Sequence, residues 1–357
     1  MDAAEVKGVC NDLPLRSGDV AVITGGARGV GASVVTKLLQ CDMHVVIGCR
    51  DVKAGEKLIE GLRASGVTSG SAECFPLDMT SHASVRKFAE SVLQKCPKIH
   101  VLINNAGIMF VPFSLTEDGF ESHFAVNYLS HCLLTHLLLP RLKASSMGRY
   151  TNCRVVNVSS CAHMAGTIYF DDFNMKDSYL PSAAYAQSKL AQILFTRALE
   201  RRLRRETAPV QAHAVHPGVV NTEIFNGTFF KQIFPWVIRL FFKSQDEGAL
   251  PVLYAAVSTE LEGKGGTYIS NCRVTQTGDL ADSEELQEKL WTAMLMAGKL
   301  CDKPSVGGHC QLSMYIQSHK ERRERAHHSY RRTTHITHGT GCTYRADRTL
   351  YPAKENL

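Results

Sequence analysis

The chain has 357 residues, of which 44% are hydrophobic, so it is long enough for one large domain or two small ones. Its formal net charge is +6, but residues 303–357 alone hold ten Lys/Arg and four Asp/Glu, so the first 302 residues are about neutral. The basic charge therefore belongs to the tail and gives no reason to expect nucleic acid as a partner of the folded body.

The twelve cysteines are scattered from Cys10 to Cys342 and contain no C-x-x-C pair. This spacing argues against a disulfide scaffold or a zinc site and favours free thiols, so no metal site is predicted. Residues 1–18 form a short polar segment without an apolar core, and no segment has the length of a transmembrane helix. These features predict a cytoplasmic protein with no signal peptide or transmembrane anchor.

Short β-branched runs alternate with helical patterns from residue 19 onward. Strands are predicted at residues 19–25, 43–49, 71–78, 99–107, 153–160, 210–218 and 266–270, with helices at 31–40, 52–65, 83–95, 120–142, around Tyr185 and at 246–258. Strands separated by helices imply right-handed crossovers and a parallel sheet. The sequence therefore predicts a single doubly wound α/β domain of the Rossmann type, with a parallel seven-stranded sheet, over residues 19–302.

The segment 303–357 is rich in His, Arg and Thr and has no apolar period, so it is predicted to be a disordered basic tail. Its histidines could bind metal, and its arginines could bind nucleic acid or acidic lipid. A solvated extension, or a splice or gene-model product, explains the same composition.

A glycine-rich turn joins the first predicted strand to the first helix. In "VITGGARGVG", Gly25, Gly29 and Gly31 allow a tight turn and a close approach to a pyrophosphate, with Arg28 and Val30 between them. The pyrophosphate would then face the N-terminus of the helix. In this strand-to-helix setting, the turn predicts a dinucleotide site.

The end of the second strand indicates which dinucleotide binds. Sites that prefer NAD usually carry an acidic residue there, whereas this chain has Arg50, with Arg28 nearby in the turn. Two guanidinium groups suit a 2′-phosphate, and Asp51 is interpreted as a helix cap. NADP(H) is therefore predicted over NAD(H), although Arg50 could also be a solvated loop residue.

Two further strand ends add cofactor contacts. Asp78 ends the third strand, where its carboxylate could accept a hydrogen bond from the adenine amino group. The sequence "NNAG" ends the fourth strand, and Asn105, Ala106 and Gly107 allow close backbone contact with the cofactor. Asn104 and Asn105 are expected mainly to hold backbone.

The stretch "AAYAQSKLAQILF" places Tyr185 four residues before Lys189 on one face of a predicted helix. The pair could be accidental, because this spacing is common in helices. Alternatively, the ammonium lowers the pKa of the phenol, which can then exchange a proton near neutral pH.

Five motifs occur in order along the chain: "TGGARGVG", "NNAG", "NVSS", "YAQSK" and "HPGVVNT". In these the chain resembles the short-chain dehydrogenase/reductase family over roughly residues 19–300. The long segment between Ser160 and Tyr185 and the "GCRD" strand end are most similar to the retinol dehydrogenase-like branch. The segments "DEGA", "YAAV" and "LEGKGGTY" resemble members of that branch associated with polyprenol metabolism.

This resemblance implies a catalytic set. Tyr185 would be the general acid/base, and Lys189 would lower its pKa and hold the nicotinamide ribose. Ser160, rather than Ser159, would bond the substrate carbonyl oxygen. Asn127 would anchor a water that relays protons to Lys189.

The motif "HPGVVNT" implies further cofactor contacts from Pro217, Gly218, Val220 and Thr222, whereas His216 is interpreted as structural. The family places a mobile lid next, and here residues 223–243 are rich in Phe, Ile and Trp. This composition suits a lipophilic substrate such as a retinoid or a polyprenol. It also suits peripheral contact of residues 228–243 with an endoplasmic reticulum or lipid-droplet surface. Packing of the lid on its own domain is the equal alternative.

The leading hypothesis is thus an NADP(H)-dependent oxidoreductase that interconverts a lipophilic alcohol and its aldehyde or ketone. The alternatives are a catalytically silent NADP(H)-binding regulator and a protein whose basic tail binds membrane or nucleic acid. The long helix through Tyr185 is a candidate dimer face.

Overall fold

A computed structural model describes residues 14–148, 151–218 and 243–300. Most of the 1–18 segment, the tail 303–357, the candidate membrane segment 228–243 except Lys243, and the predicted cofactor contacts Val220 and Thr222 lie outside these residues. Predictions that concern them remain predictions.

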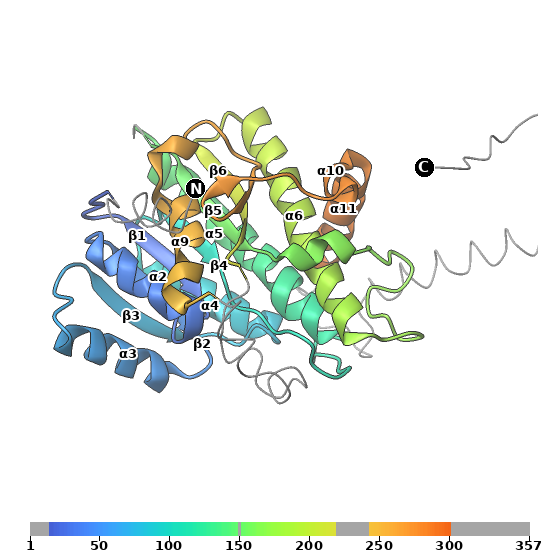
Figure 1. The fold of residues 1–357 in the computed structure, drawn as a ribbon, viewed down its shortest axis with the longest axis horizontal. Coiled ribbons are helices and arrows are strands. Elements are labelled where there is room, and N and C mark those ends of the chain that lie inside the picture. The colour runs from blue at the N-terminus through green and yellow to red at the C-terminus, as the bar shows by residue number, and fades with distance from the viewer. Residues whose placement is uncertain (1–13, 149–150, 219–242, 301–357) are drawn as a thin grey trace, which may run out of the picture.

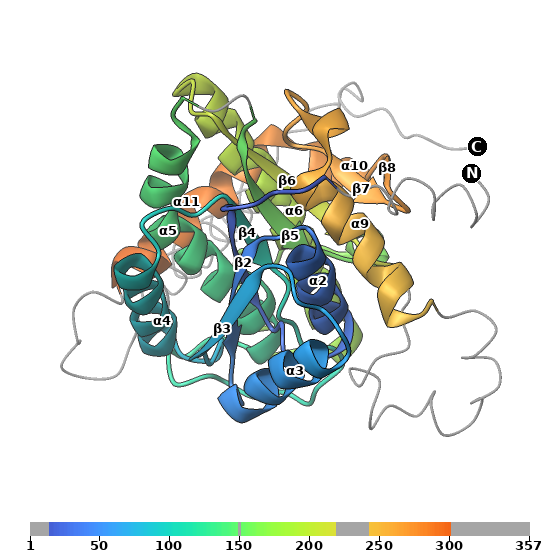
Figure 2. The ribbon, with the colours of Figure 1, turned by 90° about the vertical axis from the view of Figure 1, so that its left-hand side faces the viewer.

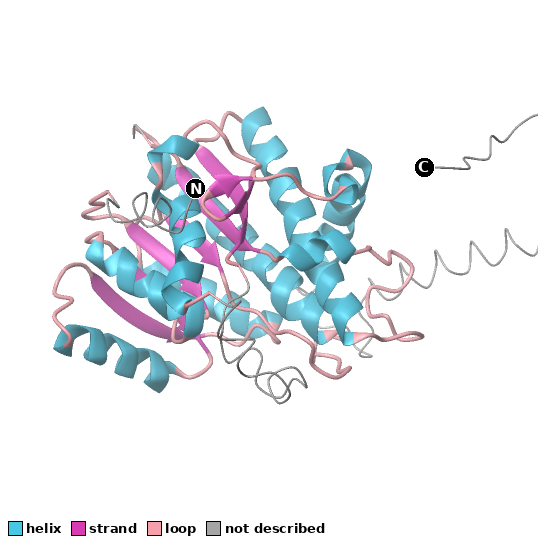
Figure 3. Ribbon diagram, viewed as in Figure 1, coloured by secondary structure: helices cyan, strands magenta, loops and turns pink. Residues whose placement is uncertain are grey.

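One eight-stranded sheet forms the centre of the molecule, in the order β3-β2-β1-β4-β5-β6-β7-β8 (Figures 1 and 3). The strands are β1 (Val20–Thr24), β2 (His44–Cys49), β3 (Ser71–Pro76), β4 (Val101–Asn104), β5 (Cys153–Val158), β6 (Val210–His216), β7 (Tyr268–Ser270) and β8 (Arg273–Val274). Strands β1 to β7 pair in parallel, which confirms the predicted doubly wound sheet. The eighth strand is a two-residue antiparallel partner of β7, too short to give a sequence pattern.

Helices cover both faces of this sheet (Figure 2). One face carries α2 (Gly29–Gln40), α3 (Val52–Ala64) and α9 (Gln245–Val257), and the other carries α4 (His82–Lys95), α5 (Ser130–Ser146), α6 (Pro181–Arg205) and α11 (Glu284–Leu300). Short elements complete the chain: the π-helix η1 (Phe124–Leu129), the 3₁₀ helices η2 (Cys161–Ala165) and η4 (Thr259–Leu261), and α10 (Asp279–Asp282). Within the described ranges, no helix is both long and apolar enough to cross a membrane.

The strands are apolar because both faces of a parallel sheet are buried. In β1, Ala21 and Ile23 face the α2 side and Val22 faces the α5 side, and none of the three is exposed. Burial of a side chain such as Val22 or Ile23 contributes about 1.5–3 kcal/mol to folding. The two cores fix the strands rigidly, so their carboxyl ends form a stable edge on which a site can be built.

Candidate active site

The predicted site residues gather at the carboxyl ends of the parallel strands. The chain leaves β1 at Thr24, β4 at Asn104 and β5 at Val158 along this edge. The strand order reverses between β1 and β4, and ligands of doubly wound sheets bind at such a switch point.

The glycine-rich turn has the geometry that the sequence predicts. Gly25 has a φ of 67°, and a Cβ added there would lie 3.0 Å from the Cα of Ala106. A Cβ added to Gly31, at the start of α2, would lie 2.3 Å from the carbonyl oxygen of Gly25. No side chain fits in either place without a shift of neighbouring protein atoms, so the tight turn into the N-terminus of α2 requires glycine at both positions.

The charged residues predicted around the nucleotide follow the carboxyl ends of β1, β2 and β3. Arg28 is the residue before α2 and Arg50 follows β2; both side chains are exposed. Asp51 is the N-cap of α3, as interpreted from the sequence, since its carboxylate accepts a hydrogen bond from Ala54 N at 3.1 Å. Asp78 Oδ1 accepts hydrogen bonds from the backbone N and the hydroxyl of Thr80, at 2.9 and 2.7 Å, which fixes the carboxylate at the end of β3.

The "NNAG" segment is held by β1. Thr24 Oγ1 accepts hydrogen bonds from the backbone N–H groups of Asn105 and Ala106, at 3.0 and 2.9 Å. Asn105 Nδ2 donates to the carbonyl oxygens of Thr24 and Gly25, so Asn105 holds backbone as expected. Asn104 does not: its side chain is buried in the sheet and donates to the side chains of Thr135 and Asn157.

Tyr185 and Lys189 lie one turn apart on α6, and both side chains are almost fully buried. Lys189 Nζ lies 5.6 Å from the centroid of the Tyr185 ring and donates hydrogen bonds to Val158 O at 2.8 Å and Gln192 Oε1 at 3.0 Å. Ser160 lies close enough to the Tyr185 phenol to lower its pKa. The neighbouring Ser159 instead donates to the carbonyl oxygen of Lys189 at 2.8 Å, which braces α6.

Burial dominates the proton affinities of this pair, and the role of Lys189 in lowering the pKa of Tyr185 stays a prediction. Burial raises the pKa of Tyr185 to about 12, and the hydrogen bond with Ser160 only partly offsets this. Burial also lowers the pKa of Lys189 to about 7, so its charge is itself weakened near neutral pH. Because desolvation acts on both groups, the phenol is protonated at pH 7 in this structure.

Asn127 lies in η1 and faces the same region. Its side chain binds both backbone groups of Ile108, with Oδ1 accepting from N at 2.9 Å and Nδ2 donating to O at 3.0 Å, and it also donates to Ser188 Oγ. A Cβ added to Gly107 would lie 3.3 Å from Asn127 Oδ1 and 3.7 Å from Lys189 Nζ. The absence of a side chain at Gly107 thus leaves room beside both predicted catalytic groups.

His131 connects Asn127 to the nucleotide turn, and the sequence-based reasoning missed it. Its Nδ1 lies 3.0 Å from the carbonyl oxygen of Asn127, and its Nε2 lies 2.8 Å from Thr24 Oγ1. Thr24 already accepts two N–H bonds, so its hydroxyl donates to Nε2, and the ring hydrogen is on Nδ1. Burial lowers the pKa of His131 to about 4, which keeps the ring neutral. Its position four residues after Asn127 on a predicted helix was the available signal.

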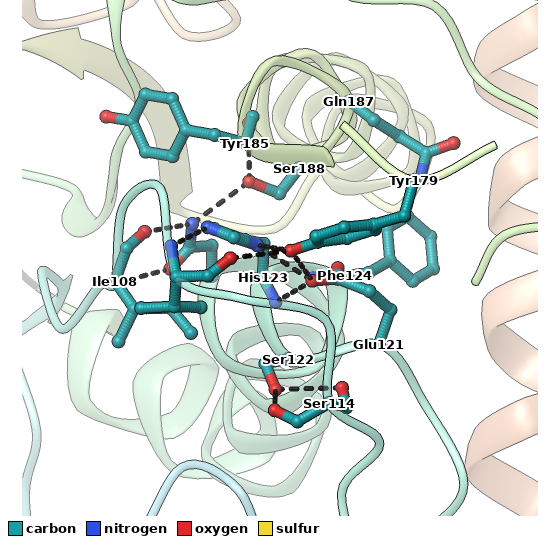
Figure 4. Close-up of polar contacts among 12 residues, drawn as sticks. Ile108, Ser114, Glu121, Ser122, His123, Phe124, Tyr179, Tyr185, Gln187 and Ser188 are labelled. Atoms are coloured by element: carbon teal, nitrogen blue, oxygen red, sulfur yellow. Dashed lines mark hydrogen bonds and ion pairs between the residues drawn. The ribbon is translucent and has the colours of Figure 1, made fainter. Parts of the chain in front are cut away.

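A second missed group lies behind Tyr185. Glu121 and His123 are fully buried, and His123 Nδ1 lies 2.7 Å from Glu121 Oε1. The Tyr179 hydroxyl reaches both, 3.2 Å from Glu121 Oε1 and 3.2 Å from His123 Nδ1 (Figure 4). The His123 ring also packs edge-on against Tyr185, with 6.2 Å between centroids. We call Glu121, His123 and Tyr179 the clamp.

The end of β6 carries the remaining described candidates, Pro217 and Gly218. Gly218 has a φ of 91°, which suits glycine, and a Cβ there would lie 2.7 Å from Lys243 Cδ. Burial lowers the pKa of the adjacent His216 to about 4. A group of possible metal ligands, His44, Glu73 and Cys96, lies near the amino-terminal ends of the strands, so it does not belong to this site.

Comparison with known proteins gives a consistent result. The short chain dehydrogenase family profile matches residues 19–232. A polyprenol dehydrogenase of Homo sapiens is 41% identical over 285 residues, which cover 78% of this chain and 85% of the relative. Retinol dehydrogenase 12 of Mus musculus is 42% identical over 284 residues, covering 80% and 87%.

Among solved structures, an uncharacterized protein of Mycobacterium paratuberculosis aligns with a TM-score of 0.66 and 34% identity. The alignment covers 81% of this chain and 97% of that one. The residues that the family profile matches include the glycine-rich turn and the Tyr185–Lys189 pair. The chain therefore belongs to the short-chain dehydrogenase/reductase family and is an NAD(P)-using oxidoreductase that acts on CH–OH donors.

Proposed function

We propose that the chain is an NADP(H)-dependent oxidoreductase that interconverts a lipophilic alcohol and its aldehyde or ketone, with Tyr185 as general acid/base. The main support for this proposal is that four side chains lie close together beside Gly107. They are Tyr185 and Lys189 of α6, Ser160 after the end of β5, and Asn127 of η1. A protein that only binds the dinucleotide has no need of this arrangement.

The residues around the turn fit a nicotinamide dinucleotide. The turn from Gly25 to Gly31 leads directly into the N-terminus of α2, where a pyrophosphate would bind, and the predicted contacts Asn105, Ala106 and Gly107 follow β4 at the switch point. The bound cofactor would supply or accept the hydride. Lys189, which lies 3.7 Å from a Cβ built on Gly107, is the group proposed to hold its ribose.

The described side chains suit proton transfer to a carbonyl oxygen. Ser160 would donate a hydrogen bond to the oxygen as negative charge develops there. The Tyr185 phenol, whose pKa is raised to about 12 by burial, is protonated at pH 7 and so ready to donate. In the reverse direction Tyr185 must first lose its proton, so oxidation of the alcohol is expected to increase as the pH rises above 7.

The preference for NADP(H) rests on Arg28 and Arg50. Both guanidinium groups are exposed at the edge of the turn, and the nearby Asp51 carboxylate is engaged in capping α3. Two guanidinium cations, together with an Asp51 carboxylate that is already hydrogen-bonded to Ala54 N, favour a 2′-phosphate over a free ribose hydroxyl.

The lipophilic substrate class is supported by the names of the relatives, polyprenol dehydrogenase and retinol dehydrogenase 12, and by the apolar composition of residues 223–243. Cytoplasmic location, peripheral contact of residues 228–243 with an endoplasmic reticulum or lipid-droplet surface, and a homodimer through α6 remain predictions from the sequence.

The test is nicotinamide absorbance with NADPH and with NADH, against retinal, farnesal and propanal, for the wild-type chain and Tyr185→Phe. We expect faster turnover with NADPH and a loss of at least about 100-fold in kcat in the variant, with NADPH affinity retained. Tight NADPH binding without turnover of any aldehyde, or of the alcohols in reverse, would instead identify a regulator.

A further inference from the structure

Phe110 lies beside Tyr185 in an unusual conformation. Its ring packs edge-on against the Tyr185 ring with 5.6 Å between centroids, yet 44% of its surface is exposed. Its φ of 56° falls in the left-handed region, which is uncommon for residues other than glycine and an outlier for a bulky side chain. Strain of this kind persists only where the surroundings enforce it, and it clusters at functional sites.

The surroundings of Phe110 do enforce it. Two residues before it, both backbone groups of Ile108 are bound by Asn127, and directly after it both backbone groups of Val111 are bound by the clamp. Val111 N donates to His123 Nε2 at 3.3 Å, and the Tyr179 hydroxyl donates to Val111 O at 2.8 Å. Rotation of Phe110 into a relaxed conformation would pull Val111 or Ile108 away from these partners.

The clamp is rigid because Glu121 anchors it. The Glu121 carboxylate is fully buried and accepts hydrogen bonds from His123 N at 2.9 Å, His123 Nδ1 at 2.7 Å and Phe124 N at 2.9 Å (Figure 4). Burial raises the pKa of this carboxyl, but these bonds outweigh burial, so the pKa is lowered overall and the group is charged. A charged acceptor at the start of η1 fixes the His123 ring, and Val111 N–H bonds to the far side of that ring.

Apolar side chains continue the surface from Phe110. Phe113 is 42% exposed and packs edge-on against the Tyr179 ring at 5.2 Å, and Leu180, the next residue after Tyr179, is 62% exposed. Exposed apolar side chains thus lie on the loop beside Tyr185 and next to Tyr179, which holds that loop.

We propose that Phe110 is the specificity-determining wall of the site, and that the clamp is a set of positioning residues that hold it. The substrate that fits is an alcohol or aldehyde whose reacting carbon carries an extended apolar chain, which packs on the Phe110 ring while its oxygen lies at Tyr185. This inference rests on the proposed function and assigns a residue to its substrate preference.

The experiment compares Phe110→Ala, Phe110→Leu and Tyr179→Phe with the wild-type chain on retinal, farnesal and propanal. Phe110→Ala should raise the KM for retinal and farnesal by about tenfold, the size expected for loss of one aromatic contact, with kcat and the propanal reaction changed less than twofold. Phe110→Leu should recover most of the loss. Tyr179→Phe, which keeps the ring on Phe113 but removes the hydroxyl from Val111, should raise the same two KM values by about threefold.

A binding measurement separates this inference from the proposed function. Retinol fluorescence with the NADPH-loaded chain gives a Kd without any turnover, and Phe110→Ala should raise this Kd by about tenfold. Met147→Ala, which removes an apolar side chain that is 76% exposed at the end of α5, should change neither Kd nor KM. If Phe110→Ala raised the KM for all three aldehydes equally, or left the retinol Kd unchanged, the proposal that Phe110 determines specificity would be wrong. Tight retinol binding without turnover would overturn the proposed function alone.

Discussion

Two regions face each other across the site, and they are held by different means. The turn from Gly25 to Gly31 is shaped by its backbone, with positive φ at Gly25 and no room for a Cβ at Gly31. The facing loop, residues 105–123, is held by side chains from Thr24, Asn127 and the clamp. A backbone-built region fails when an atom is added, whereas a region built from buried polar side chains fails when a hydrogen-bond partner is removed.

The largest effect is expected at Lys189 on α6, whose Nζ lies beside Gly107 of the facing loop. Burial lowers its pKa from 10.5 to about 7, so between pH 7 and 10.5 the unfolded chain binds the proton that the folded chain does not. The contribution of this group to the free energy of unfolding must therefore rise with pH across that window, by about 5 kcal/mol in total, and the full penalty is present below pH 7. Lys189→Met should lack this rise.

Urea unfolding of both chains at pH 6, 7, 8 and 9, without added nucleotide, measures the difference. The stability of Lys189→Met relative to the wild-type chain should be greatest at pH 6 and 7 and fall as the pH rises. Lys87→Met, which removes an exposed cation from α4, controls for the loss of one charge. Parallel pH curves for Lys189→Met and the wild-type chain would show that Lys189 is not desolvated as described.

The next effect belongs to the backbone-built region. In Gly31→Ala the new methyl would lie 2.3 Å from Gly25 O and 2.8 Å from Asn105 Nδ2, so the turn must open. We expect a loss of about 3 kcal/mol in stability and at least about 100-fold weaker NADPH binding, measured by thermal unfolding and by nucleotide fluorescence.

Gly61→Ala in α3 is the matched control, since an added Cβ there meets no atom within 4 Å. That substitution should stabilise the chain by about 0.5–1 kcal/mol, because alanine favours a helix over glycine. Normal NADPH affinity in Gly31→Ala would mean that the turn is not the nucleotide site.

This contrast also explains what the sequence could predict. The turn, the parallel sheet and the Asp51 cap follow from local patterns, because glycine spacing, strand alternation and helix caps each involve a few consecutive residues. The clamp could not be predicted, since Tyr179 lies 58 residues from Glu121 and only the folded chain brings their side chains together.

Three further features of the structure also could not be predicted from local sequence patterns. The raised pKa of Tyr185 reflects burial, which a Tyr-x-x-x-Lys spacing does not reveal. Asn104 bonds Thr135 and Asn157 rather than backbone because it ends in the sheet interior, one residue before the chain turns outward at Asn105. Strand β8 was not predicted because two residues are too few to show the alternation of a strand.

The smallest effect comes from His131, which joins the two regions. An Asn side chain at this position can still donate from the place of Nδ1 to Asn127 O, but it cannot reach Thr24. A Gln side chain can reach Thr24, but it removes the side-chain hydrogen bond to Asn127 O. His131→Gln should therefore lower kcat by about tenfold with little change in NADPH affinity. His131→Asn should instead weaken NADPH binding by about tenfold and leave kcat nearly intact, because Thr24 then holds Asn105 and Ala106 less firmly. Steady-state kinetics and NADPH titration of both variants give kcat and the Kd for NADPH. If the two variants changed kcat and Kd by the same factors, His131 would contribute by packing and not through its two hydrogen bonds.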